Sequence, residues 1–497
     1  MKNKIMSFLF WFIIVLSFLL YFSAIWTKNS FNIFNFDSVI YHLSGKIVGT
    51  SKDIIYDFIK GPLVKTILVS FIFVIIFKID YNYKPFLTIR FFNKKKYEIN
   101  VFNFLNKHRC LFANILLIIV LVYVAFDFKI IDYYRNIFSY SEFIEEHYVD
   151  PAKVNINFNN KKNLIHIYVE SLEHTFLSKE YGGAYDENLL PNLSRYMKDE
   201  VSFSNKNNSG FYSSRATEWT IASMVAQTSG VGLITTIEGN LYGINSSFLP
   251  GAYSMGEILE KEGYNQTLLI GSDADFGGRK SYFTQHGNYV IKDYLYAVKE
   301  KWIPDDYYVW WGYEDSKLFD FAKEELKLLA NENKPFNLTL LTTNTHHIGG
   351  YLEDSCEVKY DEQLKNVVLC SDKQIYNFVE WVKKQSFYKN TLIVITGDHL
   401  SMEPTFFDNI GDYERTTFNL FINANKKDIK KNNRTFCTLD LYPTILSSIG
   451  ANIEGDRLGL GTNLFSKEQT LYEEYGREYV DNEYKKTSLF YNENIVK

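Results

Sequence analysis

Hydrophobic residues are concentrated in three long stretches near the start of the chain and in shorter runs after residue 160. The long stretches lie at about residues 5–26, 62–79 and 110–128 and carry almost no charge. A helix needs roughly 20 apolar residues to cross a bilayer, and lysines near its ends can reach the headgroups. The pattern predicts about three transmembrane helices in a membrane region that covers residues 1–130.

Two of these stretches have alternative interpretations. The first is also compatible with a cleaved signal peptide, although its apolar run is long for one and no small-x-small cleavage site stands out. The second is also compatible with a buried helix in a soluble core. We therefore favour an uncleaved anchor followed by two further spans.

The charges between the stretches predict their orientation. Segment 80–109 is strongly basic, and the N-terminus carries Lys2 and Lys4. Cytoplasmic loops carry the excess of lysine and arginine, so both segments are expected on the cytoplasmic side. With three spans, the chain after about residue 130 is then expected outside the cytoplasm.

Beyond a predicted linker at 131–160, short apolar runs alternate with helical patterns. The runs are residues 164–169, 267–271, 336–344, 391–397 and 417–423. They lack polar alternation, which is typical of strands buried on both faces of a parallel sheet. This alternation predicts one α/β domain at residues 161–465, followed by a C-terminal extension at 466–497.

Composition narrows the function classes. The net charge is −5, so the chain lacks the excess of basic residues that is typical of a nucleic-acid-binding surface. Of the four cysteines, Cys110 lies in the third apolar stretch and Cys437 is expected to be a buried thiol. Cys356 and Cys370 are a disulfide candidate that suits an oxidising compartment, with two free thiols as the alternative.

Acidic residues and histidines follow several predicted strands. Glu170 ends the first run, His346 and His347 follow the third, and Asp398 and His399 follow the fourth. Ligands of open parallel sheets gather at the carboxyl ends of the strands. A glutamate, an aspartate and a histidine suit manganese, magnesium or zinc better than a thiolate-seeking metal. A helix-capping carboxylate and a capped turn are the alternatives that need no metal.

A helical pattern begins at Thr217 after a loose polar segment. A hydroxyl at a helix start lies in the positive end of the helix dipole, and a bound metal would lower its pKa further. Thr217 is therefore a candidate nucleophile, although threonine is also a common N-cap residue.

Seven segments together resemble the alkaline phosphatase and sulfatase superfamily, and more narrowly the membrane phosphoglycerol transferases, a group that includes lipoteichoic acid synthase and the enzyme that decorates periplasmic glucans. They read NLIHIYVESLEHTF (163–176), RATEWTIASMVAQTSG (215–230), GGRKSYFTQHG (277–287), WGYEDSKLFDFA (311–322), TTNTHH (342–347), TLIVITGDHLSM (391–402) and TLDLYPTIL (438–446). The resemblance implies a sulfatase-like α/β domain behind a transmembrane region in the bacterial cytoplasmic membrane. It also favours the Cys356–Cys370 pair.

The resemblance implies roles for the candidate residues. Glu170, Asp398 and His399 would bind the metal, usually manganese, with magnesium and zinc as alternatives. Thr217 would be both a fourth ligand and the nucleophile. The implied substrate-binding residues are Arg279, His347, His346 and Trp311. Phosphoglycerol would pass from phosphatidylglycerol to an envelope glycan, with diacylglycerol as the leaving group.

The chain also departs from the family pattern. It lacks the C/S-x-P-x-R motif from which sulfatases make formylglycine, which argues against sulfate ester hydrolysis. Arg215 lies unusually close to the expected nucleophile, so Thr220 is the alternative to Thr217. A phosphoethanolamine transferase, a phosphodiesterase or other sulfatase-like hydrolase, and a non-catalytic membrane-anchored binding protein remain alternative functions.

Overall fold

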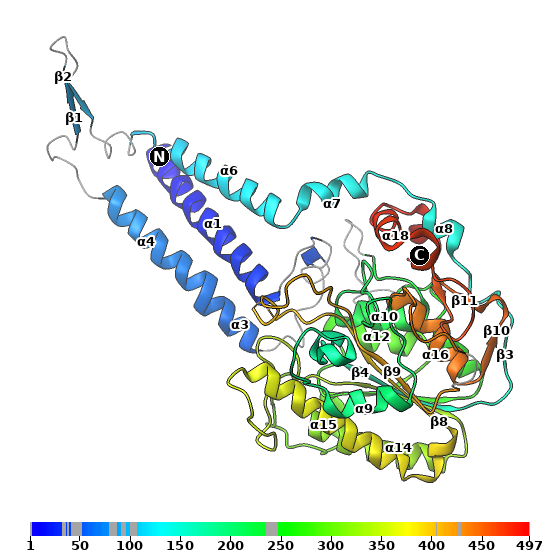
Figure 1. The fold of residues 1–497 in the computed structure, drawn as a ribbon. Coiled ribbons are helices and arrows are strands. Elements are labelled where there is room, and N and C mark those ends of the chain that lie inside the picture. Colours follow the sequence, from blue (N-terminus) through cyan, green and yellow to red (C-terminus); the bar gives the residue numbers. More distant parts are fainter. Residues whose placement is uncertain are drawn as a thin grey trace. The chain divides into compact units, whose positions relative to one another are not determined.

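The computed structural model describes residues 2–31, 36, 39–40, 52–78, 87–90, 96–99, 107–234, 247–403, 405–425 and 429–496. The chain forms two compact units (Figure 1). The first comprises residues 1–36 and 51–133, and the second comprises residues 37–50 and 134–497.

The first unit is mainly helical. Its helices are α1 (Lys2–Phe31), α3 (Lys52–Phe58), the π-helical turn Ile59–Leu63, α4 (Val64–Lys78) and α6 (Arg109–Asp127), and its strands β1 (Leu87–Arg90) and β2 (Lys96–Ile99) pair antiparallel. Among the described residues, three stretches are long and apolar enough to cross a membrane: Lys4–Ser30, Ile55–Ile75 and Arg109–Asp127. Each overlaps a predicted span, although the second begins seven residues before 62 and position 79 lies outside the described residues.

A six-stranded sheet forms the centre of the second unit. In spatial order its strands are β6 (Val290–Lys292), β5 (Asn265–Ile270), β7 (Phe336–Leu341), β4 (Asn163–Val169), β8 (Thr391–Gly397) and β9 (Asn419–Ile422). All neighbours are parallel except β9, which runs antiparallel to β8. The predicted α/β class is therefore confirmed. The sequence reading missed β6, which has only three residues.

Helices cover both faces of this sheet. Adjacent residues of β4 point to opposite sides, with Ile167 in one buried apolar cluster and Tyr168 in another. One face packs against α9 (Pro191–Asp199), α14 (Asp315–Asn331) and α15 (Gln363–Lys383). The other packs against α10 (Thr220–Ser229), α11 (Met255–Lys261), α12 (Arg279–Gln285) and α16 (Leu441–Ser448). Burial on both faces explains the unbroken apolar runs.

The segment predicted as a linker is largely part of the second unit. It contains α7 (Ile130–Ile137), α8 (Phe143–His147) and β3 (Ile156–Phe158). Strand β3 pairs antiparallel with β10 (Ala451–Ile453), and the side chains of Phe143 and Ile144 belong to the apolar core. These contacts give residues 143–158 a fixed place, which a linker would lack.

The predicted C-terminal extension is also integral to the second unit. Its helices are α17 (Leu471–Tyr475), α18 (Arg477–Tyr484) and α19 (Leu489–Asn494). The Gly232 N–H donates to the Tyr484 hydroxyl oxygen (2.8 Å), and the Tyr491 hydroxyl donates to the Gly232 carbonyl (2.7 Å). Both tyrosines are buried in the core. The tail therefore contacts the segment that follows α10.

Candidate metal centre and nucleophile

Glu170, Asp398 and His399 converge at the carboxyl ends of two neighbouring strands. Glu170 follows β4, and the other two follow β8, whose last residue, Gly397, lies opposite Val169 in the parallel ladder. One ligand atom from each of the three side chains lies within 4.8 Å of the others, and all three residues are buried. The convergence predicted from the strand ends is confirmed.

Gly397 allows this close approach of the two strand ends. A Cβ atom at this position would lie 2.0 Å from the Leu172 carbonyl oxygen, closer than any real contact. The chain after Glu170 therefore crosses directly over Gly397, and only glycine leaves room for it.

Hydrogen bonds orient the three side chains toward one another. Oδ1 of Asp398 accepts the backbone N–H groups of Ser171 (2.7 Å) and His399 (2.8 Å). Its Oδ2 is buried without a hydrogen bond and lies 3.3 Å from His399 Nε2. His399 Nδ1 lies 2.8 Å from the Leu400 carbonyl, so Nδ1 carries the proton and the Nε2 lone pair faces the carboxylates.

This arrangement places negative charge and lone pairs together in a buried space. Burial raises the pKa of Asp398 to about 7, and the charge of Glu170 adds to the shift. For His399, burial lowers the pKa, but the carboxylates of Asp398 and Glu170 outweigh it and leave the pKa raised. Two buried carboxylates and an imidazole nitrogen that faces them are the donor set that a divalent cation needs, and the cation would take the place of the proton on that nitrogen. The three residues can therefore hold a metal ion.

Hydroxyl groups of one serine and two threonines hold Glu170 in place. The Ser171 hydroxyl donates to Glu170 Oε1 (2.7 Å), and the Glu170 N–H donates to the Thr342 hydroxyl (3.0 Å). The Thr345 hydroxyl donates to the Glu170 carbonyl. Sequence reasoning singled out the histidines of the segment TTNTHH and missed the supporting role of its threonines, which only their contacts reveal.

Thr217, the predicted nucleophile, forms its side-chain hydrogen bonds with residues outside this group. Its hydroxyl donates to the Ser214 carbonyl (2.7 Å) and contacts the Thr438 hydroxyl (3.1 Å). Its side chain is also fully buried. A nucleophile has to reach both its activating group and its substrate, and Thr217 is placed for neither.

Thr220 occupies the position that was expected of Thr217. Its Oγ1 lies 3.4 Å from Glu170 Oε2 and 3.4 Å from His399 Nε2, and the residue is only partly buried. Thr220 is also the first residue of α10, after Trp219, whose extended backbone precedes the helix. The hydroxyl thus lies at the positive end of the helix dipole. The sequence pattern placed the start of this helix three residues too early.

The predicted substrate-binding side chains form a cluster beside the metal group. The Trp311 ring lies 4.6 Å from the His346 ring and 5.3 Å from the Phe276 ring. The Arg279 guanidinium lies 5.4 Å from the same Phe276 ring, and the His347 ring stacks on His346 at 4.6 Å. The sequence reading did not single out Phe276, which joins the arginine to the tryptophan.

His346 is close enough to the metal group to sense its charge. Burial lowers the pKa of His346 to about 4, its hydrogen bond to the His347 carbonyl opposes this shift, and the charge of His399 lowers the pKa further. His346 is therefore a neutral imidazole at neutral pH.

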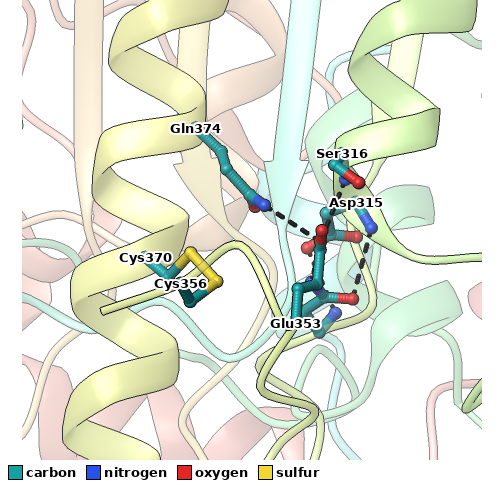
Figure 2. Close-up of a disulfide and its surroundings, with 7 residues drawn as sticks. Asp315, Ser316, Glu353, Cys356, Cys370 and Gln374 are labelled. Carbon is teal, nitrogen blue, oxygen red and sulfur yellow. Dashed lines mark hydrogen bonds between the residues drawn. A yellow bond between two sulfur atoms is a disulfide. The ribbon is translucent and has the colours of Figure 1, made fainter. Parts of the chain in front are cut away.

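The predicted disulfide is present. Cys356 is bonded to Cys370, with their Cα atoms 5.6 Å apart, and it joins the segment after β7 to α15 (Figure 2). Cys437 is a buried free thiol, as expected.

Comparison with known proteins identifies relatives of this domain. The sulfatase family model matches residues 162–451. Phosphoglycerol transferase I of Xanthomonas campestris pv. campestris (strain B100) is 33% identical over 316 residues, which are 62% of this chain and 43% of that protein. Its counterpart in Escherichia fergusonii is 32% identical over 335 residues, 64% of this chain and 41% of that protein. The chain thus spans less than half the length of these relatives.

Among solved structures, the lipoteichoic acid synthase LtaP of Listeria monocytogenes is similar over 65% of this chain and 81% of that chain. The two are 17% identical, with a TM-score of 0.49.

Proposed function

The chain belongs to the sulfatase family, and from that premise we propose that it is a membrane-anchored phosphoglycerol transferase that uses Thr220 as its nucleophile. It would move phosphoglycerol from phosphatidylglycerol to a cell-envelope glycan. The relatives named phosphoglycerol transferase I support phosphoglycerol as the transferred group. The observation that carries the proposal is the position of the Thr220 hydroxyl, 3.4 Å from both Glu170 and His399.

A threonine nucleophile also separates this proposal from sulfate ester hydrolysis. Sulfatases of this superfamily use formylglycine made from cysteine or serine. Thr220 cannot supply that group, whereas its hydroxyl can form a phosphodiester with a phosphorylated substrate.

Glu170, Asp398 and His399, with Thr220 as a fourth ligand, would hold the metal. The resemblance favours Mn²⁺, and the oxygen and imidazole donors also suit Mg²⁺ or Zn²⁺. When bound, such an ion lowers the pKa of the Thr220 hydroxyl and offsets negative charge on the phosphoryl oxygens.

In the first half of the reaction, Thr220 Oγ1 attacks the phosphorus of phosphatidylglycerol. The bond between phosphorus and the diacylglycerol oxygen breaks, and that oxygen takes up the proton that Thr220 loses. The helix dipole of α10 favours the alkoxide form of Thr220. In the second half, an acceptor hydroxyl attacks the phosphorus of the phosphoglycerol-threonine. The bond between phosphorus and Thr220 Oγ1 breaks, and Thr220 takes up the proton that the acceptor hydroxyl loses.

The remaining side chains would hold the donor headgroup. Arg279 is a permanent cation and would bind the phosphoryl oxygens as charge develops on them. His346 and His347 would bind the glycerol hydroxyls, since a neutral imidazole both donates and accepts a hydrogen bond. Trp311 packs against His346 and would shape the glycerol pocket.

The membrane region would keep this site near its lipid substrate. The basic N-terminus and the basic segment 80–109 favour a cytoplasmic location for both, which exposes the second unit outside the cytoplasmic membrane. A lipid donor would then be available in the outer leaflet.

Labelled lipid tests the proposal directly. We would supply the full-length protein, in detergent with Mn²⁺, with phosphatidylglycerol that carries a labelled glycerol headgroup. We expect diacylglycerol release and a labelled peptide that contains Thr220, and neither in a Thr220→Ala variant. Label transferred from phosphatidylethanolamine instead would identify a phosphoethanolamine transferase. No turnover with any phospholipid would overturn the proposal.

A further inference from the structure

The segment after β7, which carries His346 and His347, is held at Asn344 by two buried carboxylates. Asp315 accepts the N–H of Thr343 at Oδ1 (2.8 Å) and the N–H of Asn344 at Oδ2 (3.1 Å). The Asp315 N–H in turn donates to the Asn344 side-chain oxygen (3.2 Å). The side-chain nitrogen of Asn344 donates to Glu353 Oε1 (2.6 Å). Asn344 is therefore held from both sides.

Glu353 joins three separate elements. Besides Asn344, its Oε1 accepts the N–H of Ser316 at the start of α14 (3.1 Å) and the side-chain nitrogen of Gln374 on α15 (2.9 Å), as Figure 2 shows. The residue is only 6% exposed. We call the group Asp315, Asn344 and Glu353 the clasp.

The disulfide anchors the clasp to the same helix. Cys356 donates its N–H to the Glu353 carbonyl (2.9 Å) and is bonded to Cys370, one turn before Gln374 on α15 (Figure 2). Glu353 is thus tied to α15 twice, once through its own carboxylate and once through the chain that follows it. A covalent bond of this kind limits the freedom of the short segment between its ends.

Holding a loop with two buried carboxylates costs desolvation free energy. Burial raises the pKa of Asp315 to about 7, and the N–H groups of Thr343 and Asn344 oppose the shift. Apolar packing could fix the chain at a lower cost, but a set of directional hydrogen bonds also fixes its orientation. That orientation places the His346 ring against Trp311, beside the metal group.

We propose that Asp315 and Glu353 are positioning residues, which act through Asn344 to hold His346 and His347 at the donor headgroup. This inference rests on the proposed function, because the two histidines are the proposed headgroup ligands. Neither carboxylate binds the metal or touches the reacting atoms. Loss of the clasp should therefore impair use of the donor and leave the metal group intact.

Hydrogen exchange of the full-length protein tests the structural half without any substrate. The Tyr351 N–H donates to the Asn344 carbonyl, and the His346 N–H donates to the Thr343 carbonyl, so both amides report on the segment. We expect faster exchange at these amides in Glu353→Ala and in the double variant Cys356→Ala/Cys370→Ala. Glu353→Gln should exchange nearly as the wild type does, because its side-chain oxygen can still accept. Unchanged exchange in Glu353→Ala would overturn the proposal.

Donor kinetics test the functional half. Misplacement of a binding group by about 1 Å can cost on the order of 10²-fold in rate, so Glu353→Ala should lose between about 10-fold and 10²-fold in kcat/KM for phosphatidylglycerol, mainly through KM. Glu353→Gln should recover most of it, and Mn²⁺ content should stay unchanged. In the His347→Ala background, Glu353→Ala should lower kcat/KM by a smaller factor than it does in the wild type, because the effects of coupled residues are not additive.

A matched control separates positioning from general destabilisation. Glu325 is a similarly buried carboxylate that accepts from Thr267 and pairs with Lys292, away from this segment. Glu325→Ala should lower stability without raising KM for the donor. An equal rise in KM for both variants, or additive losses with His347→Ala, would overturn the positioning role. Absence of diacylglycerol release by the wild type would instead overturn the proposed function, and hydrogen exchange would still decide whether the clasp holds the segment.

Discussion

The Thr396 hydroxyl on β8 donates a hydrogen bond to the side-chain oxygen of Gln227 on α10, at 2.9 Å. The Gln227 side-chain nitrogen also donates to the Gly397 carbonyl (3.3 Å), and the glutamine is fully buried. The helix that begins with Thr220 is thus bonded to the strand that ends before Asp398. This connection keeps the hydroxyl and the metal ligands in one arrangement.

Replacing Gln227 tests that connection. We expect Gln227→Met, which has a similar volume, to lose roughly 1–3 kcal/mol of unfolding free energy, because the Thr396 hydroxyl and the Gly397 carbonyl lose a buried partner. Denaturant unfolding of the full-length protein would measure this. The variant should also lower kcat for diacylglycerol release, since α10 would no longer be fixed to β8. Equal stability and equal kcat would show that the hydrogen bonds have no such role.

The two threonines should respond in opposite ways to substitution. Thr220→Ala should lower kcat by at least about 10³-fold, because removal of a nucleophile leaves only binding and electrostatic contributions. Thr217→Val keeps the shape and loses the hydrogen bond to Ser214, so it should retain activity and lose about 1 kcal/mol of stability. Diacylglycerol release and thermal unfolding of both variants check this. An inactive Thr217→Val protein with wild-type stability would restore Thr217 as the nucleophile.

Removing one carboxylate should have opposite effects on the metal-free and the metal-loaded protein. Without metal, Asp398→Asn removes one of two buried like charges, and we expect the unfolding free energy to rise by about 1 kcal/mol or more. With Mn²⁺, the wild type should become more stable because the ion binds the folded state, and the variant should gain little. Thermal unfolding with and without Mn²⁺ or a chelator measures both effects. A variant that Mn²⁺ stabilises as strongly as the wild type would exclude Asp398 as a ligand.

Metal affinity should fall as the pH drops below neutrality. The pKa of Asp398 is raised to about 7 in the metal-free protein, so a proton occupies this carboxylate below that pH and competes with the cation. We expect Mn²⁺ affinity to fall by up to about tenfold per pH unit below 7 and to level off above it. Titration calorimetry between pH 5.5 and 8.5 would measure the change. An affinity that is constant across this range would contradict the raised pKa.

The stability of the metal-free protein should depend on pH in the opposite sense. A carboxyl group whose pKa is raised on folding stabilises the folded state fully below its ordinary pKa. That contribution is lost as the pH rises through the folded value, which is about 7 for Asp398. In the presence of a chelator, the unfolding free energy of the wild type should therefore fall relative to that of Asp398→Asn as the pH rises from about 4 to about 7.

Some features of the site were predictable because they follow from local rules. Glu170 and Asp398 each come directly after a buried strand, and parallel strands place their carboxyl ends at one edge of the sheet. Cys356 and Cys370 stood out as the pair in a polar segment. The clasp was not predictable, since nothing in the pattern indicates that Asp315, Asn344 and Glu353 meet.

The amino-acid sequence by itself determined the three apolar spans, five of the six strands of the sheet and the three metal-ligand candidates, because hydrophobic runs and strand ends are local features of the chain. Only the tertiary structure showed that the hydroxyl of Thr220, and not that of Thr217, lies near Glu170 and His399. Both are threonines near the start of one helix, and a shift of three residues in that start changes which hydroxyl faces Glu170 and His399. The hydrogen bonds between α10 and β8 join residues about 170 positions apart in the chain, which a local sequence pattern does not reveal.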